Sequence, residues 1–129
     1  MTPITISFPA PDVYLSLNDR VHWRRNAERV ATWRNCSKLM WTSGAARGDH
    51  PRNLEGRWLV SLTLTFPTNN RRDASNYIAT LKPIIDGLKD GGAWPDDDGR
   101  YVVTAEPALM FHRGDRQVVI TLEPIAGAS

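Results

Sequence analysis

Carboxylates gather on both sides of one short stretch of the chain. Asp73 precedes this stretch, and three consecutive aspartates at positions 96–98 follow it. Between them lie Lys82 and Asp86, whose spacing of four residues places them on one face of a helix. Clustered carboxylates are typical of sites for Mg²⁺ or Mn²⁺, which prefer oxygen ligands and keep positions open for water and phosphate. With a lysine nearby to stabilise developing negative charge, the pattern predicts metal-dependent hydrolysis of a phosphodiester.

Each of these features also has a purely structural interpretation. An Asp-Gly pair such as that at positions 98–99 is common in turns. Asp73 could be a helix N-cap, a role for which Ser75 competes. Lys82 and Asp86 could form a solvated pair worth a few tenths of a kcal/mol. On the residues alone, both interpretations stay open.

Basic residues surround the first of the aspartates and recur near the start of the chain. Arg71 and Arg72 directly precede Asp73 and could hold phosphates beside a metal site. A second basic patch is expected from three arginines, Arg20, Arg24 and Arg25. His22 or Trp23 could stack on an exposed base, although core packing is an equal alternative for Trp23. Core packing is the expectation for three other tryptophans, Trp33, Trp41 and Trp58, and for Cys36.

Hydrophobic periodicity predicts the elements that must position these residues. Alternating residues predict strands over 2–8, 58–66, 101–111 and 117–123. Spacings of three and four predict helices over about 26–45 and 75–89, the second of them kinked or restarted at Pro83. The order β-α-β-α-β-β predicts an α+β fold: a single two-layer domain over residues 1–129, with a mixed sheet packed against two helices.

Composition narrows the class of protein. The chain has 129 residues, 41% of them hydrophobic and 23% charged, and one cysteine, Cys36, which cannot form an internal disulfide. We expect a cytoplasmic protein without a signal peptide or membrane span, because no apolar run approaches about 20 residues. Residues 1–72 carry 11 Lys and Arg against 5 Asp and Glu, whereas residues 73–129 carry 5 against 9. This distribution suits a protein that neutralises phosphates and also holds a cation, although for this feature alone chance segregation of surface charge is the favoured explanation.

One run of motifs resembles a known family. Arg71-Arg72-Asp73-Ala74-Ser75-Asn76, then Lys82 and Asp86-Gly87-Leu88, then Trp94-Pro95-Asp96-Asp97 is similar in order and spacing to the RusA family of Holliday junction resolvases. The core of that family reads D-x-D-N, a helix with a lysine and D-[AG]-L, and a loop ending in D-D. The resemblance covers about residues 68–104. It extends weakly to the start of the chain, where Phe8-Pro9-Ala10-Pro11 leads to Asn18 and a basic loop.

The resemblance implies a homodimer that binds four-way DNA junctions and, with Mg²⁺ or Mn²⁺, cuts them by paired phosphodiester hydrolysis in DNA recombination and repair. A bacterial or phage-infected cell is the implied setting. The implied catalytic residues are Asp73, Lys82, Asp97 and Asp98. The implied metal ligands are Asp73, Ser75, Asp86, Asp97 and Asp98. The implied DNA contacts are Asn18, Arg20, Arg24, Arg25, Arg71, Arg72 and Asn76.

Two alternatives remain within this resemblance. Asp97 matches the catalytic aspartate of the D-D pair when the alignment is anchored on Trp94, and Asp98 matches it when the alignment is anchored on the following strand. Ser75 stands where the family has a second aspartate, and a hydroxyl is a weaker ligand for Mg²⁺ than a carboxylate. Asp86, Asp96 or Asp98 could compensate, the activity could be reduced, or the protein could bind junctions without cutting them. We expect retained but reduced activity. Lys82 also lies three residues later than in some family members.

Overall fold

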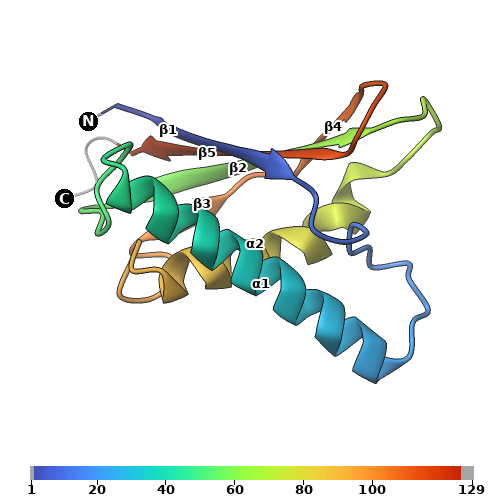
Figure 1. Cartoon of the computed structure of the whole chain (residues 1–129), viewed down its shortest axis with the longest axis horizontal. Coiled ribbons are helices and arrows are strands. Elements are labelled where there is room, and N and C mark those ends of the chain that lie inside the picture. The colour runs from blue at the N-terminus through green and yellow to red at the C-terminus, as the bar shows by residue number, and fades with distance from the viewer. Residues whose placement is uncertain (1, 126–129) are drawn as a thin grey trace.

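The computed structural model describes residues 2–125, so Met1 and residues 126–129 of the expected domain lie outside the described part of the chain. The described elements are, in chain order, β1 (Ile4–Pro9), α1 (Trp23–Ala46), β2 (Trp58–Phe66), the 3₁₀ helix η1 (Ala74–Tyr77), α2 (Ile78–Asp90), β3 (Val102–Thr104), β4 (Ala108–Phe111) and β5 (Gln117–Pro124). The strands form one layer and the two helices form the other, which lies along a single face of the sheet (Figure 1). The α+β prediction is confirmed.

The sheet is mixed, as expected. Its order is β1-β5-β2-β3, with β5 antiparallel to both of its neighbours, β1 and β2. β3 and β4 pair in parallel with successive parts of β2. The prediction of one continuous strand over 101–111 is therefore wrong. The interruption at residues 105–107 ends in buried Pro107, which has no N–H to continue the ladder.

The core lies between the sheet and the helices. Alternate residues of β2 are buried from Trp58 to Phe66, as the sequence pattern predicts. On the neighbouring strand, Val118, Ile120 and Leu122 are buried beside them in the antiparallel register. Trp33 and Trp41 of α1 are completely buried beneath this surface. The expected core positions of these tryptophans and of Trp58 are confirmed.

The two helices begin and break differently from the prediction. α1 begins at Trp23, three residues earlier than expected, and the chain enters α2 through the 3₁₀ turn η1. α2 is one helix from Ile78 to Asp90, so the predicted restart at Pro83 is wrong. Pro83 is buried among core residues of the same helix, and this packing offsets the one backbone hydrogen bond that a proline removes.

α1 and α2 approach each other closely at Gly87. A β-carbon there would overlap the carbonyl oxygen of Arg34 and would lie 2.8 Å from Ser37 Cβ. Ser37 Oγ donates a hydrogen bond of 2.7 Å to the carbonyl of Ile84 across the same interface. The position of α2 is thus fixed by backbone contact with α1. Within residues 2–125, no helix has both the length and the apolar character needed to cross a lipid bilayer.

Candidate functional site

Three of the residues singled out in the sequence meet on the exposed side of α2. Lys82 Nζ lies 3.1 Å from Asp86 Oδ1, one helical turn away, and 2.7 Å from Asp97 Oδ2. Asp97 comes from the loop that follows α2 and returns along the helix. The lysine side chain is 68% exposed, whereas both carboxylates are about four-fifths covered. We call Lys82, Asp86 and Asp97 the acidic cluster.

Electrostatics keep this cluster charged. The hydrogen bond from Lys82 is the main cause that lowers the pKa of Asp97 to about 2. Reciprocally, hydrogen bonds to Asp97 and then to Asp86 raise the pKa of Lys82. Asp97 is therefore a carboxylate and Lys82 an ammonium at neutral pH, so the cluster presents fixed charges to anything that binds there.

α1 contributes one further charge to this region. Arg34 forms a two-point ion pair with Asp90, with nitrogen–oxygen distances of 2.6 and 2.9 Å. Its third guanidinium nitrogen lies 4.0 Å from Asp86 Oδ2. Arg34 thus connects the two helices beside the acidic cluster and holds the turn of α2 that carries Asp86.

The other two aspartates of the loop have different partners. Asp98 binds Arg100 at 2.7 Å, and this hydrogen bond is the main cause that lowers the pKa of Asp98. Asp96 Oδ1 accepts a hydrogen bond of 2.8 Å from the backbone N–H of Asp97 and lies 3.7 Å from Lys89 Nζ. Of the two alignments left open, the structure therefore brings Asp97 and not Asp98 to Lys82.

Asp73 and Ser75 lie apart from the acidic cluster. Asp73 is the N-cap of η1, and its Oδ1 accepts from the backbone N–H of Ser75 at 3.2 Å and from Ser75 Oγ at 2.8 Å. η1 and the first turn of α2 stand between Asp73 and Lys82 in the chain, and within residues 2–125 no hydrogen bond or ion pair joins Asp73 to the acidic cluster. Asn76 lies on the same turn, and its carbonyl accepts from the backbone N–H of Leu17 at 2.8 Å. The expected residues thus fall into two groups.

The acidic cluster offers a divalent cation two carboxylate ligands and not a complete set. In the part of the chain that the structure describes, no three Asp, Glu, His or Cys side chains converge as a complete set of metal ligands. Asp86 and Asp97 do converge, on the position that the ammonium group of Lys82 holds, and the exposed lysine has room to turn outward. One or two carboxylates, with water and substrate phosphate, are the usual protein ligands of Mg²⁺. Asp86 and Asp97 are therefore the residues that could hold it.

The two arginines before Asp73 have different roles. Arg72 turns inward: its guanidinium carbon lies 3.9 Å from the centre of the Phe66 ring. It donates to Thr68 and to the carbonyl of Asn70, so it shapes the loop after β2. Arg71 is exposed and has no ion pair or side-chain hydrogen bond within residues 2–125. Arg71 is the one free to contact a phosphate.

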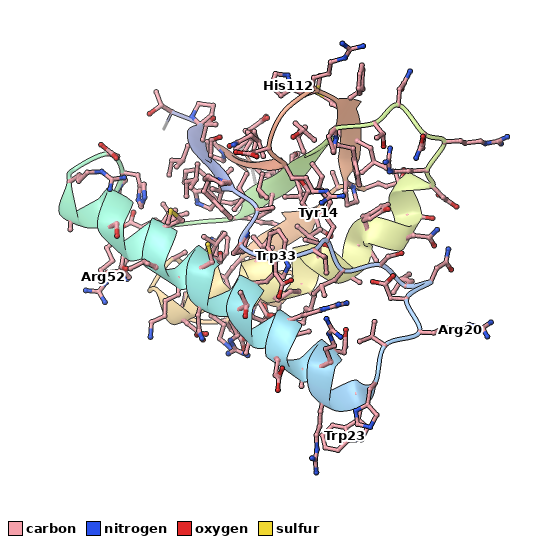
Figure 2. The ribbon with its side chains drawn as sticks, turned by 45° about the vertical axis from the view of Figure 1, so that its right-hand side comes forward. Tyr14, Arg20, Trp23, Trp33, Arg52 and His112 are labelled. Atoms are coloured by element: carbon pink, nitrogen blue, oxygen red, sulfur yellow. The ribbon has the colours of Figure 1, made fainter. Side chains whose placement is uncertain are left out.

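The basic residues just before α1 and in its first turn stay in solvent. Arg20, Arg24 and Arg25 are exposed, and none of them forms an ion pair with another described residue. Trp23 is 69% exposed; His22 stacks against it with ring centres 5.7 Å apart, and the guanidinium of Arg24 lies 5.3 Å from its ring. Arg20 and Trp23 both point away from the body of the protein (Figure 2). We call residues 18–25, which include exposed Asn18, the basic segment.

Two arginines in the turn between β4 and β5 were not among the expected DNA contacts. Arg113 and Arg116 are exposed and flank the expected Gly114-Asp115 turn. Phe66 pairs with Phe111, so this turn begins beside the loop that carries Arg71. The missing signal was the parallel pairing of β4 with β2, which periodicity does not reveal.

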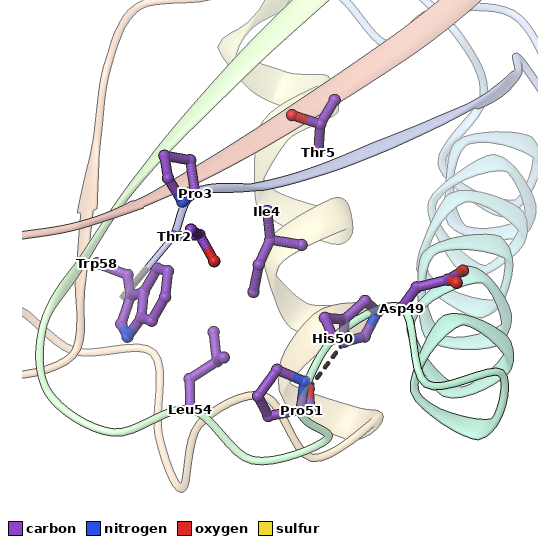
Figure 3. A pocket seen from close by; sticks show the side chains of 9 residues that line it. All are labelled: Thr2, Pro3, Ile4, Thr5, Asp49, His50, Pro51, Leu54 and Trp58. Carbon is purple, nitrogen blue, oxygen red and sulfur yellow. Dashed lines mark hydrogen bonds between the residues drawn. The ribbon is translucent and has the colours of Figure 1, made fainter.

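A cavity of about 240 Å³ lies beneath the start of β1, away from all these residues (Figure 3). Its walls include Leu54 and Trp58. His50 stacks on Trp41 with ring centres 3.9 Å apart, and its Nδ1 lies 2.8 Å from the carbonyl oxygen of Pro51. These contacts are those of a histidine packed in the core, and none of the expected site residues lines this cavity.

Comparison with known proteins identifies a relative of this chain but does not indicate an activity. No protein-family model matches the chain. An uncharacterized protein of Xylella fastidiosa is 34% identical over 128 residues, a match that covers 97% of this chain and 78% of the relative. Identity at this level over nearly the whole chain means that the two share a common fold. The chain therefore belongs to the same family as this Xylella fastidiosa protein.

Proposed function

We propose that this protein is a metal-dependent endonuclease that cuts branched DNA, with the acidic cluster as its reaction site. The observation that carries the proposal is the convergence of Asp86, Asp97 and Lys82 on one open face. Two carboxylates can hold a cation, and an ammonium group can contact a phosphate. The similarity of the surrounding motifs to the RusA family supports DNA junctions as the substrate.

The residues of the cluster divide the work. A divalent ion held by Asp86 and Asp97 would neutralise charge on the phosphate and lower the pKa of the attacking water. Asp97 stays anionic at any pH well above 2 because of its lowered pKa, so it can hold a cation. The pKa of Lys82 is raised, so this side chain stays protonated and stabilises negative charge on a phosphate oxygen. Arg34 positions Asp86 through α2 and is not expected to contact DNA.

The DNA backbone would be held by the unpaired arginines. Arg71 and the three arginines of the basic segment have no acidic partner among the described residues, and phosphates would supply one. Two copies of the chain related by a two-fold axis would place one site on each of two opposed strands of a junction. The cytoplasm of a bacterial or phage-infected cell is the compartment in which such a substrate arises.

The test is cleavage of a labelled synthetic four-way junction in Mg²⁺ and in Mn²⁺, with linear duplex of the same sequence as the control. We expect paired nicks in the junction and none in the duplex. Equal cutting of both DNAs would contradict the junction specificity. A protein that neither cuts nor shifts the junction would contradict the proposal as a whole.

A second candidate function is junction binding without cutting. The observation that favours it is the Asp73–Ser75 turn, which is closed on itself and separate from the acidic cluster. If this is the function, the junction is shifted on a native gel but is not nicked at any concentration of either metal. The Ser75→Asp variant, which adds the carboxylate that the resemblance implies at this position, is then the protein to test: gained nicking would assign the reaction site to the Asp73–Ser75 turn and not to the acidic cluster.

A further inference from the structure

A second cavity, of about 370 Å³, lies where the chain passes from β1 into α1. Its lining includes Leu17, Val21, Trp23, Asn26, Val30 and Ala79. The segment behind it is fixed by buried hydrogen bonds: Thr80 Oγ1 accepts from the N–H of Leu15 at 2.9 Å and donates to the carbonyl of Leu15 at 2.7 Å. The cavity is therefore part of the folded structure and borders the start of α2.

Its apolar walls are unusually open to solvent. Leu17 is 64% and Trp23 is 69% exposed, whereas the other four tryptophans are at most 3% exposed. A tryptophan left in water at the rim of an apolar pocket indicates a ligand surface, because its burial would be favourable. His22 and Arg24 already lie against this indole, and aromatic rings flanked by cations are typical platforms for stacked bases.

Polar groups and charges at the rim favour one kind of occupant. The amide of Asn26 forms no hydrogen bond with another described residue, and such an amide can donate to and accept from the edge of a base. Arg24 lies against the Trp23 ring, and Arg20 and Arg25 are exposed on the same segment. Of the residues that line the pocket only Asp19 is charged, and its Oδ2 accepts a hydrogen bond of 3.3 Å from the N–H of Ser16. An apolar peptide would leave these cations unneutralised, whereas a nucleotide brings its own phosphates.

We propose that this pocket holds one unpaired nucleobase of branched DNA, stacked on Trp23 with Asn26 at its edge. The flanking phosphates lie against Arg20, Arg24 and Arg25. The inference rests on the proposed DNA function and deepens it, because it makes the preferred substrate a junction with an unpaired nucleotide at its branch. The base lies beside Ala79 at the start of α2, three residues before Lys82 of the acidic cluster.

The experiment compares a fully paired four-way junction with the same junction carrying one unpaired adenine at its branch. In a parallel probe 2-aminopurine, whose fluorescence is quenched on stacking, replaces that adenine. We expect the unpaired base to raise affinity about tenfold and its probe to be quenched. Trp23→Ala removes both effects, whereas Trp23→Phe keeps most of them. The matched control is Leu39→Ala, at an exposed apolar residue of α1 outside the pocket, which changes neither.

The outcomes separate this inference from the proposed function. If both junctions bind equally and the probe stays bright, the pocket assignment is overturned and the branched-DNA function stands. If Trp23→Ala weakens both junctions equally, Trp23 is a general contact and the assignment is likewise overturned. If no junction binds, but a single-stranded adenine oligonucleotide binds and quenches Trp23, the pocket stands and the junction function fails. If neither DNA binds, both are overturned. If Trp23→Ala alters only self-association, the pocket assignment is overturned and the branched-DNA function stands.

Discussion

The charged side chains of the acidic cluster have partners within the protein, whereas the arginines of the basic segment have none among the described residues. Lys82 lies between Asp86 and Asp97, and Arg34 is paired with Asp90 beside them. In the basic segment, Arg20, Arg24 and Arg25 have no acidic partner among residues 2–125. In the first region each of these charged side chains already has a partner within the protein, and one negative charge is in excess. The arginines of the second region would be neutralised only by a bound polyanion. The first region is therefore suited to chemistry and the second to binding.

The acidic cluster and the basic segment also differ in how closely their surroundings are packed. The acidic cluster sits on the close contact between α1 and α2, next to Gly87 and the hydrogen bond from Ser37 to Ile84. The basic segment leads into the first turns of α1, where every residue from Trp23 to Glu28 is exposed. The helix backbone that carries Lys82 and Asp86 therefore has a fixed position, while the side chains of the basic segment can adapt to a partner.

The largest effect is expected from Asp97→Asn. The amide is neutral and cannot replace the charge that Asp97 offers to a cation, so junction nicking should fall by about 100-fold or more. Junction affinity should change little, because binding is assigned to the arginines. The measurement is the single-turnover nicking rate beside a native-gel affinity. Asp115→Asn, in the exposed β4–β5 turn, is the matched control and should nick normally. A parallel loss of rate and affinity would break the division between the two regions.

The triple variant Arg20→Gln, Arg24→Gln and Arg25→Gln tests the other side of the comparison. Each lost phosphate contact should reduce the slope of log affinity against log salt by about 0.9, so the total change should be about 2 to 3. Arg47→Gln at the far end of α1, where the arginine is paired with Asp49 at 3.0 Å, is the control and should leave the slope unchanged. An unchanged slope in the triple variant would remove the basic segment from the DNA interface.

The Gly87→Ala substitution tests whether the acidic cluster depends on the close packing of α1 against α2. The added methyl group would meet the backbone of α1, so we expect the free energy of unfolding to fall by about 1 to 3 kcal/mol in urea denaturation. At Gly99 the space around a β-carbon is open, so Gly99→Ala is the matched control. Nicking should fall more than junction affinity, since Asp86 moves with α2. Equal stability of the two variants would contradict the described contact.

The smallest effect concerns acid pH. The pKa of Asp97 falls from the ordinary 3.8 to about 2 in the folded protein, so its contribution to stability is present above about pH 4. That contribution is lost as the pH falls through 2. Lys82→Met should therefore destabilise the protein slightly near pH 5 and not near pH 2, by urea midpoints. The effect is small because the lysine is exposed and solvent screens the pair. The same substitution in an Asp97→Asn background should show no such pH dependence.

Local patterns in the sequence were enough for most of the fold. The alternation from Trp58 to Phe66 and the spacing in the helices predicted the elements, because a buried face imposes its period on the chain. The break at residues 105–107 was missed, since both halves have the pattern of strands and only the pairing with β2 divides them. Pro83 was given too much weight because burial of its neighbours outweighs one lost hydrogen bond.

The site was predictable in its residues but not in their grouping. The spacing of Lys82 and Asp86 was sufficient to pair them, because a helix fixes that geometry. The return of Asp97 to the same lysine depends on a loop that no local pattern specifies. The separation of Asp73 from this group, and the inward turn of Arg72 onto Phe66, likewise depend on contacts between distant segments.

The exposed first turns of α1 have a consequence for how this family can diversify. Residues from Trp23 to Glu28 contribute nothing to the core, so substitutions there are free of the volume constraints that act on Trp33 and Trp41. Changes in this stretch can alter the ligand that is recognised while the fold keeps its stability. Relatives that share the buried pattern of the helices can therefore differ in specificity through a handful of surface positions.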